Sequence, residues 1–405
     1  MTAVIEVILL SYLAGCILYN LILSIAGRMQ RKKNTQHLPA AAEGPYAKMA
    51  ILIPAYKEDS IILSTAQSYT RLNYPSGQYE VIVIADSLQP ETLQQLRGSG
   101  VTVVPVSFDK STKARSLNAA FAQLEDNYDL ALICDADNML ATDFLLLVNQ
   151  AFQAGEYAIQ SQRVAKNLNT PFAVLDAANE IIANHIYRKG ANALGLSSSV
   201  IGSGMAFHYP LIKNIMQEID ATGGFDKVLQ LMVISKGHAI YYLEDAQVFD
   251  EKVEHAETFE HQRRRWLSSQ LVYLRHYWKK GWHELFRGNI DYFNLAVCQN
   301  LLLPRLLLVV AVTLVTCLYI VLHQYLLLPV AWWIALWVCN CISLLLPIPG
   351  KFFSRYLLTA LLGLPRAAFI MVMLLFRLKG ANNRFIHTKH TKTEIDNPLL
   401  DVAGK

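Results

Sequence analysis

Long apolar stretches lie near both ends of the chain, and a block that mixes apolar and polar residues separates them. The first stretch covers residues 3–26 and holds a single acid, Glu6. A helix of this length crosses a bilayer core of roughly 30 Å. Three more apolar stretches follow at residues 300–322, 326–348 and 356–376. The pattern therefore predicts N- and C-terminal transmembrane helices.

Basic residues follow the first apolar stretch, from Arg28 to Lys33. This order is typical of a signal anchor, with the N-terminus outside and the next block in the cytoplasm. The third late stretch holds Pro365 and Arg366, so it either crosses the membrane or lies at its surface. A surface position keeps the basic residues after Phe376 in the cytoplasm. We therefore favour two late spans and an interfacial third segment.

Aromatic and basic residues mingle in the segment just before the late apolar stretches. They are Tyr273, Tyr277, Trp278, Trp282, Arg275, Lys279, Lys280 and Arg287. Their helical spacing favours a helix at the membrane surface, and an ordinary amphipathic surface helix is the alternative. We expect residues 267–297 to form this interface helix.

The middle block has the pattern of an α/β domain. Short apolar runs at residues 49–54, 79–84, 101–106 and 130–134 predict strands, and residues 60–72, 91–97 and 113–124 have helical patterns between them. Strands that alternate with helices indicate a mostly parallel sheet with helices on both faces.

Polar side chains follow three of these strands. Tyr56 and Glu58 follow the first, Asp86 the second, and Asp135 and Asp137 the fourth. Parallel strands end at one edge of the sheet, where ligands bind in such folds, so these groups should converge. Two carboxylates one residue apart can bind a hard divalent cation, although an isolated pair is more often a solvated turn.

Composition and charge limit the function classes. The chain has 405 residues, of which 53% are hydrophobic and 17% charged, and this excludes a protein that is soluble throughout. A net charge of +4, without a basic run rich in aromatics, argues against nucleic acid as a partner. The six cysteines form no CxxC pair, which argues against a disulfide scaffold or a cysteine zinc site.

A series of short motifs resembles the membrane-bound family 2 glycosyltransferases, which include cellulose, chitin, hyaluronan and poly-N-acetylglucosamine synthases. The matching segments are residues 53–58, the strand end at Asp86, residues 113–118, residues 135–137, residues 223–226, and the QxxRW motif at residues 262–266. They occur in the expected order between the expected membrane segments. The resemblance implies a GT-A fold, a nucleotide-sugar donor, Mg²⁺ or Mn²⁺, and inversion at the anomeric carbon.

The resemblance also implies roles for individual residues around the donor and the acceptor. Tyr56 and Glu58 would bind the nucleoside, Asp86 the uracil, Lys113 the base and diphosphate, Asp135 the nucleotide and metal, Asp137 the metal, and Gln262, Arg265 and Trp266 the diphosphate and the acceptor sugar. Chemistry supports this, because a cation and an arginine stabilise the charge on a departing diphosphate.

The base that deprotonates the acceptor has two candidates, Asp226 and the pair Glu244 and Asp245. The family usually has an acidic pair where this chain has Phe225 before Asp226. We favour Asp226, because a helical pattern and then Gly237 follow it as the family resemblance requires. The alternative role for Asp226 is a helix N-cap. The alternative for the other pair is a polar turn between strands.

Several residues have simpler alternative explanations. Tyr56 could be a packing aromatic, and Lys113 could only begin a helix. We expect Arg263 and its neighbour Arg264 to contact lipid headgroups. His387 and His390 lack a carboxylate partner in the sequence pattern, so we interpret them as part of a cytoplasmic tail rather than a metal pair.

Together these patterns predict an ordered series of segments. They are a transmembrane helix at 1–27, a linker at 28–47, a cytoplasmic GT-A domain at 48–266, an interface helix at 267–297, transmembrane or interfacial helices at 298–378, and a basic tail at 379–405. The leading function is an inverting β-glycosyltransferase of the bacterial inner membrane that extends a cell-surface polysaccharide from a UDP-sugar, together with membrane lipids and possible export or accessory proteins. The alternatives are a lipid acceptor, as in ceramide glucosyltransferases, or a non-catalytic partner of a synthase.

Overall fold

A computed structural model of the chain describes residues 2–30, 45–219, 223–377 and 390–400. Within them an eight-stranded sheet has the order β3-β2-β1-β4-β7-β6-β8-β5. The strands are β1 (Met49–Tyr56), β2 (Tyr79–Asp86), β3 (Thr102–Val106), β4 (Leu130–Ile133), β5 (Met139–Leu140), β6 (Ala158–Ala165), β7 (Met205–His208) and β8 (Tyr241–Asp250). The four strands predicted from apolar runs are β1 to β4, and they pair in parallel.

Helices cover both faces of the sheet, as predicted. They are α2 (Ile62–Tyr69), α3 (Pro90–Arg97), α4 (Lys113–Gln123), α5 (Phe144–Gln153), α8 (Tyr209–Gln217) and α9 (Phe225–Ser235). Side chains alternate along β1, so Ile51 and Ile53 pack towards α2 and α5 on one face. Ala50 and Leu52 pack towards α4, α8 and α9 on the other. A strand buried on both faces requires the unbroken apolar run seen in the sequence.

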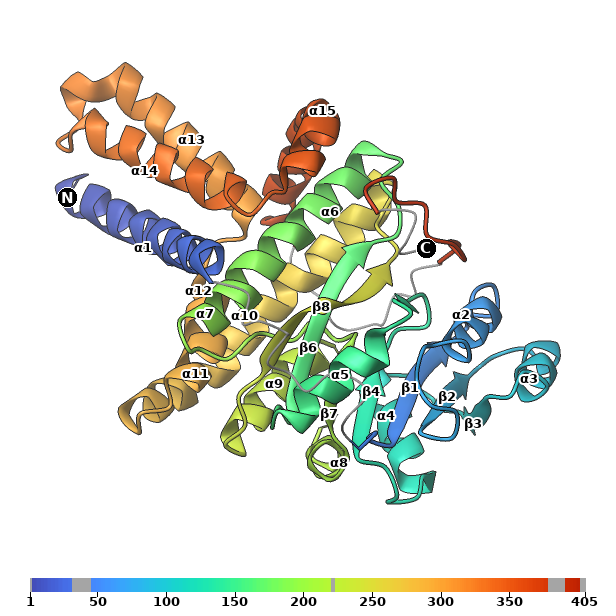
Figure 1. Cartoon of the computed structure of the whole chain (residues 1–405). Helices are drawn as coiled ribbons and strands as arrows, with labels where there is room; N and C mark the ends of the chain where they lie inside the picture. Colours follow the sequence, from blue (N-terminus) through green and yellow to red (C-terminus); the bar gives the residue numbers. More distant parts are fainter. Residues whose placement is uncertain (1, 31–44, 220–222, 378–389, 401–405) are drawn as a thin grey trace.

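Four apolar helices lie outside this domain: α1 (Thr2–Met29), α13 (Arg305–Leu322), α14 (Val330–Leu345) and α15 (Gly350–Leu374). In the described residues, α1, α13 and α15 are long and apolar enough to cross a membrane, and α14 is shorter. Figure 1 shows α1, α13 and α14 side by side, whereas α15 lies against α6 (Pro171–Ala183) and contacts the start of α13 through Leu307. Helix α15 continues through Pro365 and begins before the predicted stretch.

The single acid of α1 joins that helix to the connection between α13 and α14. Glu6 is buried and accepts hydrogen bonds from the Tyr319 hydroxyl (2.8 Å) and from the backbone N–H groups of Leu327 and Leu328. A carboxylate in an apolar helix is costly unless it is hydrogen-bonded. This contact therefore explains why the apolar stretch tolerates an acid.

The QxxRW motif and the first part of the predicted interface segment, residues 267–286, belong to one helix, α10 (Ala256–Phe286), whereas residues 287–297 lie beyond its end. The domain boundary predicted after Trp266 therefore falls inside a continuous helix, and the interface segment is not a separate element. The remaining short helices are η2 (Asn184–Gly190), α7 (Ala191–Ala193), α11 (Ile290–Phe293), η3 (Asn294–Cys298), α12 (Gln299–Leu301) and η4 (His323–Tyr325).

Close packing connects α1 to the catalytic domain through η2. A Cβ on Gly190 would lie 2.1 Å from the backbone oxygen of Leu23, and a Cβ on Gly27 would lie 2.9 Å from His185. Only glycine permits two backbones to approach this closely. The N-terminal helix is therefore held rigidly against the domain that carries the site. Most of the predicted linker and most of the basic tail lie outside the described residues.

Candidate active site

A cavity of about 810 Å³ opens at the carboxyl ends of the strands, a volume in the upper part of the range of ligand sites. Every residue that the sequence predicted for the site, except Asp86, lines this cavity. The strand ends, α4, α9 and α10 contribute these residues. The predicted convergence of polar groups at one sheet edge is therefore confirmed for the described part of the chain.

The ends of β1 and β2 lie beside each other at one side of the cavity. Tyr56 pairs with Asp86 in the strand register, and Asp86 is buried next to the cavity rather than in its wall. One oxygen of Asp86 accepts from Ser87, and the other has no partner among the described residues. Lys57 and Ser87, which follow the two strands, both have positive φ angles, of 56° and 58°. Such strain in residues other than glycine clusters at functional sites.

Lys113 meets the first carboxylate after β4. Its ammonium group pairs with Asp135 and donates to the carbonyl oxygen of Gly202 at 2.6 Å. Lys113 also begins α4, whose N-cap Thr112 accepts from a backbone N–H. Lys113 therefore begins a helix and also lies in the site, so the two explanations do not exclude each other. A cation that points at a strand end is suited to bind a diphosphate oxygen.

Asp137 is the more buried of the two carboxylates after β4, with 4% of its surface exposed. Burial raises its pKa to about 6, with a further rise from Asp250 and Asp135 and a decrease from His390. A divalent cation would relieve this charge with the oxygen ligands that it prefers. Asp137 and the partly exposed Asp135 therefore fit a metal that also binds phosphate oxygens.

His390 lies in the cavity wall and has a carboxylate partner that the sequence pattern did not show, although it still belongs to the C-terminal tail. Its Nδ1 lies 3.2 Å from Oε1 of Glu58. Burial lowers the pKa of His390, but Asp137 and Glu58 outweigh this and raise the pKa to about 10. The backbone N–H groups of Thr391 and Lys392 donate to Glu251. His387 lies outside the described residues.

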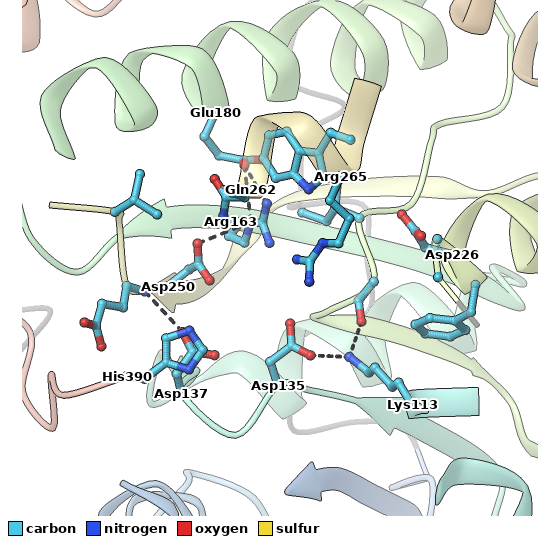
Figure 2. A pocket seen from close by; sticks show the side chains of 18 of the residues that line it. Lys113, Asp135, Asp137, Arg163, Glu180, Asp226, Asp250, Gln262, Arg265 and His390 are labelled. Atoms are coloured by element: carbon cyan, nitrogen blue, oxygen red, sulfur yellow. Dashed lines mark hydrogen bonds and ion pairs between the residues drawn. The ribbon is translucent and has the colours of Figure 1, made fainter. Parts of the chain in front are cut away.

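Asp226 is the second residue of α9 and points into the cavity near Arg265 (Figure 2). The N-cap of this helix is Gly224, with φ of 64°, so the N-cap alternative for Asp226 is wrong. Burial raises the pKa of Asp226, against the opposing effects of Lys227 and Lys113. A carboxylate with a raised pKa is a stronger proton acceptor.

The rival acidic pair lies elsewhere. Glu244 and Asp245 belong to β8, where the register with β6 shifts, and not to a turn between strands. Glu244 pairs with Lys189 at 2.8 Å. Neither acid lines the cavity. The geometry therefore offers Asp226, and not this pair, to a bound acceptor.

The QxxRW motif occupies the first turns of α10. Gln262, Arg265 and Trp266 line the cavity, and Trp266 is 38% exposed. Arg263 is buried, pairs with Asp176, and lies 4.2 Å from the Trp266 ring centroid. The prediction that Arg263 contacts lipid headgroups is therefore wrong, because this arginine stabilises the position of the motif from inside the domain.

A buried charged network, which no sequence motif predicted, forms a further wall. It comprises Arg163, Glu180, Arg188, Asp250 and Lys252. Glu180 accepts from Arg163 at 2.8 Å and from Arg188 at 3.1 Å. Burial alone would raise the pKa of Glu180, but these cations hold it well below its usual range. These residues come from separate elements of the fold, so no local spacing in the sequence predicts the network.

Figure 2 shows Asp226 and Asp137 on opposite sides of Arg265. One side offers oxygen ligands for a cation, and the other offers a separate carboxylate for proton transfer. Arg265 lies between them and Lys113 lies beside Asp135, so both cations are near the place where charge on a leaving diphosphate would develop. This division of groups is what a sugar transfer from a nucleotide donor requires.

Known proteins provide an independent comparison. The sequence model of the family described as "Glycosyltransferase like family 2" matches residues 45–269, which is more than half of the chain. A β-monoglucosyldiacylglycerol synthase of Trichormus variabilis is 25% identical over 264 residues, covering 60% of this chain and 53% of that protein. A probable glycosyltransferase, YdaM, of Bacillus subtilis is 25% identical over 259 residues, covering 60% and 58%. The chain thus matches little more than half the length of these relatives.

A solved structure shares the fold. The mannosyltransferase PcManGT from Pyrobaculum calidifontis, in complex with GDP-Man and Mn²⁺, aligns with a TM-score of 0.51 at 15% identity. The alignment covers 92% of this chain and 99% of that one. The predicted GT-A fold is therefore confirmed.

Proposed function

This chain belongs to glycosyltransferase family 2 and is a glycosyltransferase, and from that premise we propose that it transfers a sugar from a UDP-sugar to a membrane lipid, with inversion. One observation carries the choice of acceptor. The cavity that begins at the strand ends extends to Arg305, the first residue of the apolar helix α13. The candidate donor-binding residues and the first residue of a membrane helix thus line the same cavity.

Donor binding uses the strand-end residues. Tyr56 and Glu58, in the cavity wall, would flank the nucleoside, and Asp86 is buried behind them with one oxygen that has no hydrogen-bond partner among the described residues. Asp137 and Asp135 would hold Mg²⁺ or Mn²⁺, and the ion would neutralise charge on the diphosphate. Lys113 and Arg265 donate to the diphosphate as the bond to the sugar breaks.

Asp226 removes the proton of the acceptor hydroxyl as that oxygen attacks the anomeric carbon. Attack from the side opposite the departing diphosphate inverts the anomeric configuration. The separation of Asp226 from the metal side in Figure 2 supports this assignment, because the base must face the acceptor.

The neighbourhood of the base favours an acceptor from the membrane. Lys227, next to Asp226, donates to the side-chain oxygen of Asn300 at 2.6 Å. Gln270, on α10, donates to the carbonyl oxygens of Asn300 and Leu302. Asn300 and Leu302 lie just before α13, so these hydrogen bonds hold the region of the base close to the start of a membrane helix. The name of the Trichormus relative also indicates a lipid acceptor.

A growing polysaccharide is the second candidate acceptor, supported by Trp266. Its ring is 38% exposed in the cavity wall and offers a flat apolar face on which a sugar can stack. The family resemblance to polysaccharide synthases supports the same acceptor.

Membrane placement follows from the helices and the tail. We propose that the catalytic domain and the tail lie on the cytoplasmic side of a bacterial inner membrane. Contacts of Thr391 and Lys392 with Glu251 support a common side for both. The exposed Trp278 and Trp282 of α10 support an interfacial position for that helix.

Release of UDP from a panel of UDP-sugars tests the proposal. Purified full-length chain is supplied with Mg²⁺ or Mn²⁺ and with lipid vesicles, an oligosaccharide, or no acceptor. Release stimulated by lipid supports the proposal, and release stimulated only by the saccharide supports the polysaccharide candidate. No release with any donor would favour the role of a non-catalytic partner.

A further inference from the structure

A charged network beside Arg305 holds more cations than carboxylates. In it Arg163, Arg188, Lys252 and Arg263 pair with three carboxylates, Asp176, Glu180 and Asp250, whereas Arg305 bonds to Asn179. The ion pairs of the first four cations use all three carboxylates. A buried surplus of charge is costly unless a ligand or solvent balances it.

Arg305 is the cation left without a carboxylate in the part of the chain that the structure describes. Its Nη2 donates to the side-chain oxygen of Asn179 at 2.6 Å and to the Asn179 carbonyl at 3.0 Å. The guanidinium lies 5.2 Å from the Tyr187 ring centroid. Its Nη1 is buried and has no hydrogen-bond partner among these residues. Arg305 is therefore positioned by neutral groups, and no carboxylate of the described residues forms an ion pair with it.

Two independent features beside Arg305 also suit an anion. Arg188, only 3% exposed, lines the same cavity and has an Nε without a partner among the described residues. Arg305 also begins α13, whose N-cap Pro304 supplies no side-chain cap. The first backbone N–H groups of this helix have no intrahelical partner, and the helix dipole favours negative charge there.

We propose that the cavity beside Arg305 binds a phosphate group of the acceptor lipid, and that Arg305 is the residue that selects such a lipid. The inference rests on the proposed lipid acceptor and names its chemical class, a phospholipid whose head group carries a free hydroxyl. The phosphate lies at Arg305 and Arg188, and the hydroxyl reaches Asp226. Arginine is suited to this role because its planar donors match phosphate oxygens.

Two lipids that share a free hydroxyl and differ in the phosphate test the proposal. Phosphatidylglycerol and diacylglycerol are each presented in phosphatidylcholine vesicles to the full-length chain with its UDP-sugar. We expect a lower KM for phosphatidylglycerol. An equal KM, or transfer to diacylglycerol alone, would overturn the inference and leave the lipid-transferase proposal standing. Transfer to a saccharide and to neither lipid would overturn both.

Arg305→Gln makes the test specific to one side chain. Loss of a charged hydrogen bond to phosphate should raise the KM for phosphatidylglycerol roughly 10- to 100-fold. The KM for diacylglycerol and the affinity for UDP should stay nearly unchanged. Arg305→Lys should recover part of the loss, and Arg97→Gln, at an exposed arginine of α3, is the matched control. Equal effects of Arg305→Gln on both lipids would indicate a structural role and overturn the proposal.

Inorganic phosphate distinguishes a free anion from a lipid head group. Inhibition that competes with phosphatidylglycerol, and that Arg305→Gln abolishes, supports the site. Inhibition that competes only with the UDP-sugar would place the phosphate at the donor diphosphate and contradict the proposal.

Discussion

Replacing Asp226 by Asn changes one oxygen to nitrogen at the candidate base and keeps the shape of the side chain. The carboxylate lies at the second position of α9, where burial raises its pKa. Asparagine cannot accept the acceptor proton, and general bases contribute roughly 10²- to 10⁴-fold to rate. We therefore expect kcat to fall by that factor, which is about 3–5 kcal/mol in the barrier.

The same change should have little effect on folding. Losing a negative charge near a helix N-terminus costs about 0.3–1 kcal/mol, and relief from burying that charge offsets part of it. The catalytic loss is thus several times larger than the structural one. UDP affinity should stay nearly unchanged, since Figure 2 places Asp226 away from Asp137.

Single-turnover transfer and calorimetric UDP binding separate these effects. The matched control is the Glu244→Gln/Asp245→Asn double variant, whose acids lie in β8 outside the cavity wall. The control should keep substantial activity. Normal turnover by Asp226→Asn, together with loss of turnover in the control, would show that the base is wrongly assigned.

The buried groups lead to four further predictions. Asp137→Asn should abolish metal-dependent transfer without unfolding the chain, and full activity in excess chelator would contradict the metal site. Because the pKa of Asp137 is raised to about 6, protons should compete with the metal as pH falls through that value, so metal titrations should show weaker binding below pH about 6 than above it. Glu180→Gln removes the carboxylate partner of Arg188 and one of the two carboxylate partners of Arg163, and it should cost roughly 3–5 kcal/mol, measured as a lower unfolding temperature in detergent; an unchanged temperature would refute the network's role. Gly190→Ala places a Cβ against the backbone of α1 and should destabilise the chain by about 1–3 kcal/mol in the same assay, whereas wild-type stability would show that α1 can move away freely.

Local sequence patterns predicted the parallel strands β1 to β4 and the convergence of polar groups at their ends. Strand β1 is buried on both faces of the sheet, and its run of apolar residues predicted this. Parallel strands end at the same edge, so the polar residues after them converge as expected: Tyr56, Glu58, Asp135 and Asp137. The periodicity after Asp226 likewise predicted α9.

The errors arose where a side chain meets a partner far away in the sequence. Arg263 was expected to contact lipid because basic clusters beside membrane helices commonly do, but its partner Asp176 is 87 positions away. His390 contacts Glu58 across 332 positions, and no local pattern encodes such a contact. The amino-acid composition changes after Trp266, but the helical periodicity continues. A domain boundary predicted from composition therefore fell inside α10.

The anomeric configuration of the lipid product tests the central claim most directly. Full-length chain in phospholipid vesicles receives an α-linked UDP-sugar and the metal, and the lipid fraction is extracted and analysed by NMR of the anomeric proton. We predict a β-linked glycolipid formed in equal amount with UDP, and none with Asp226→Asn. An α-linked product, or UDP release without any glycosylated lipid, would contradict the account.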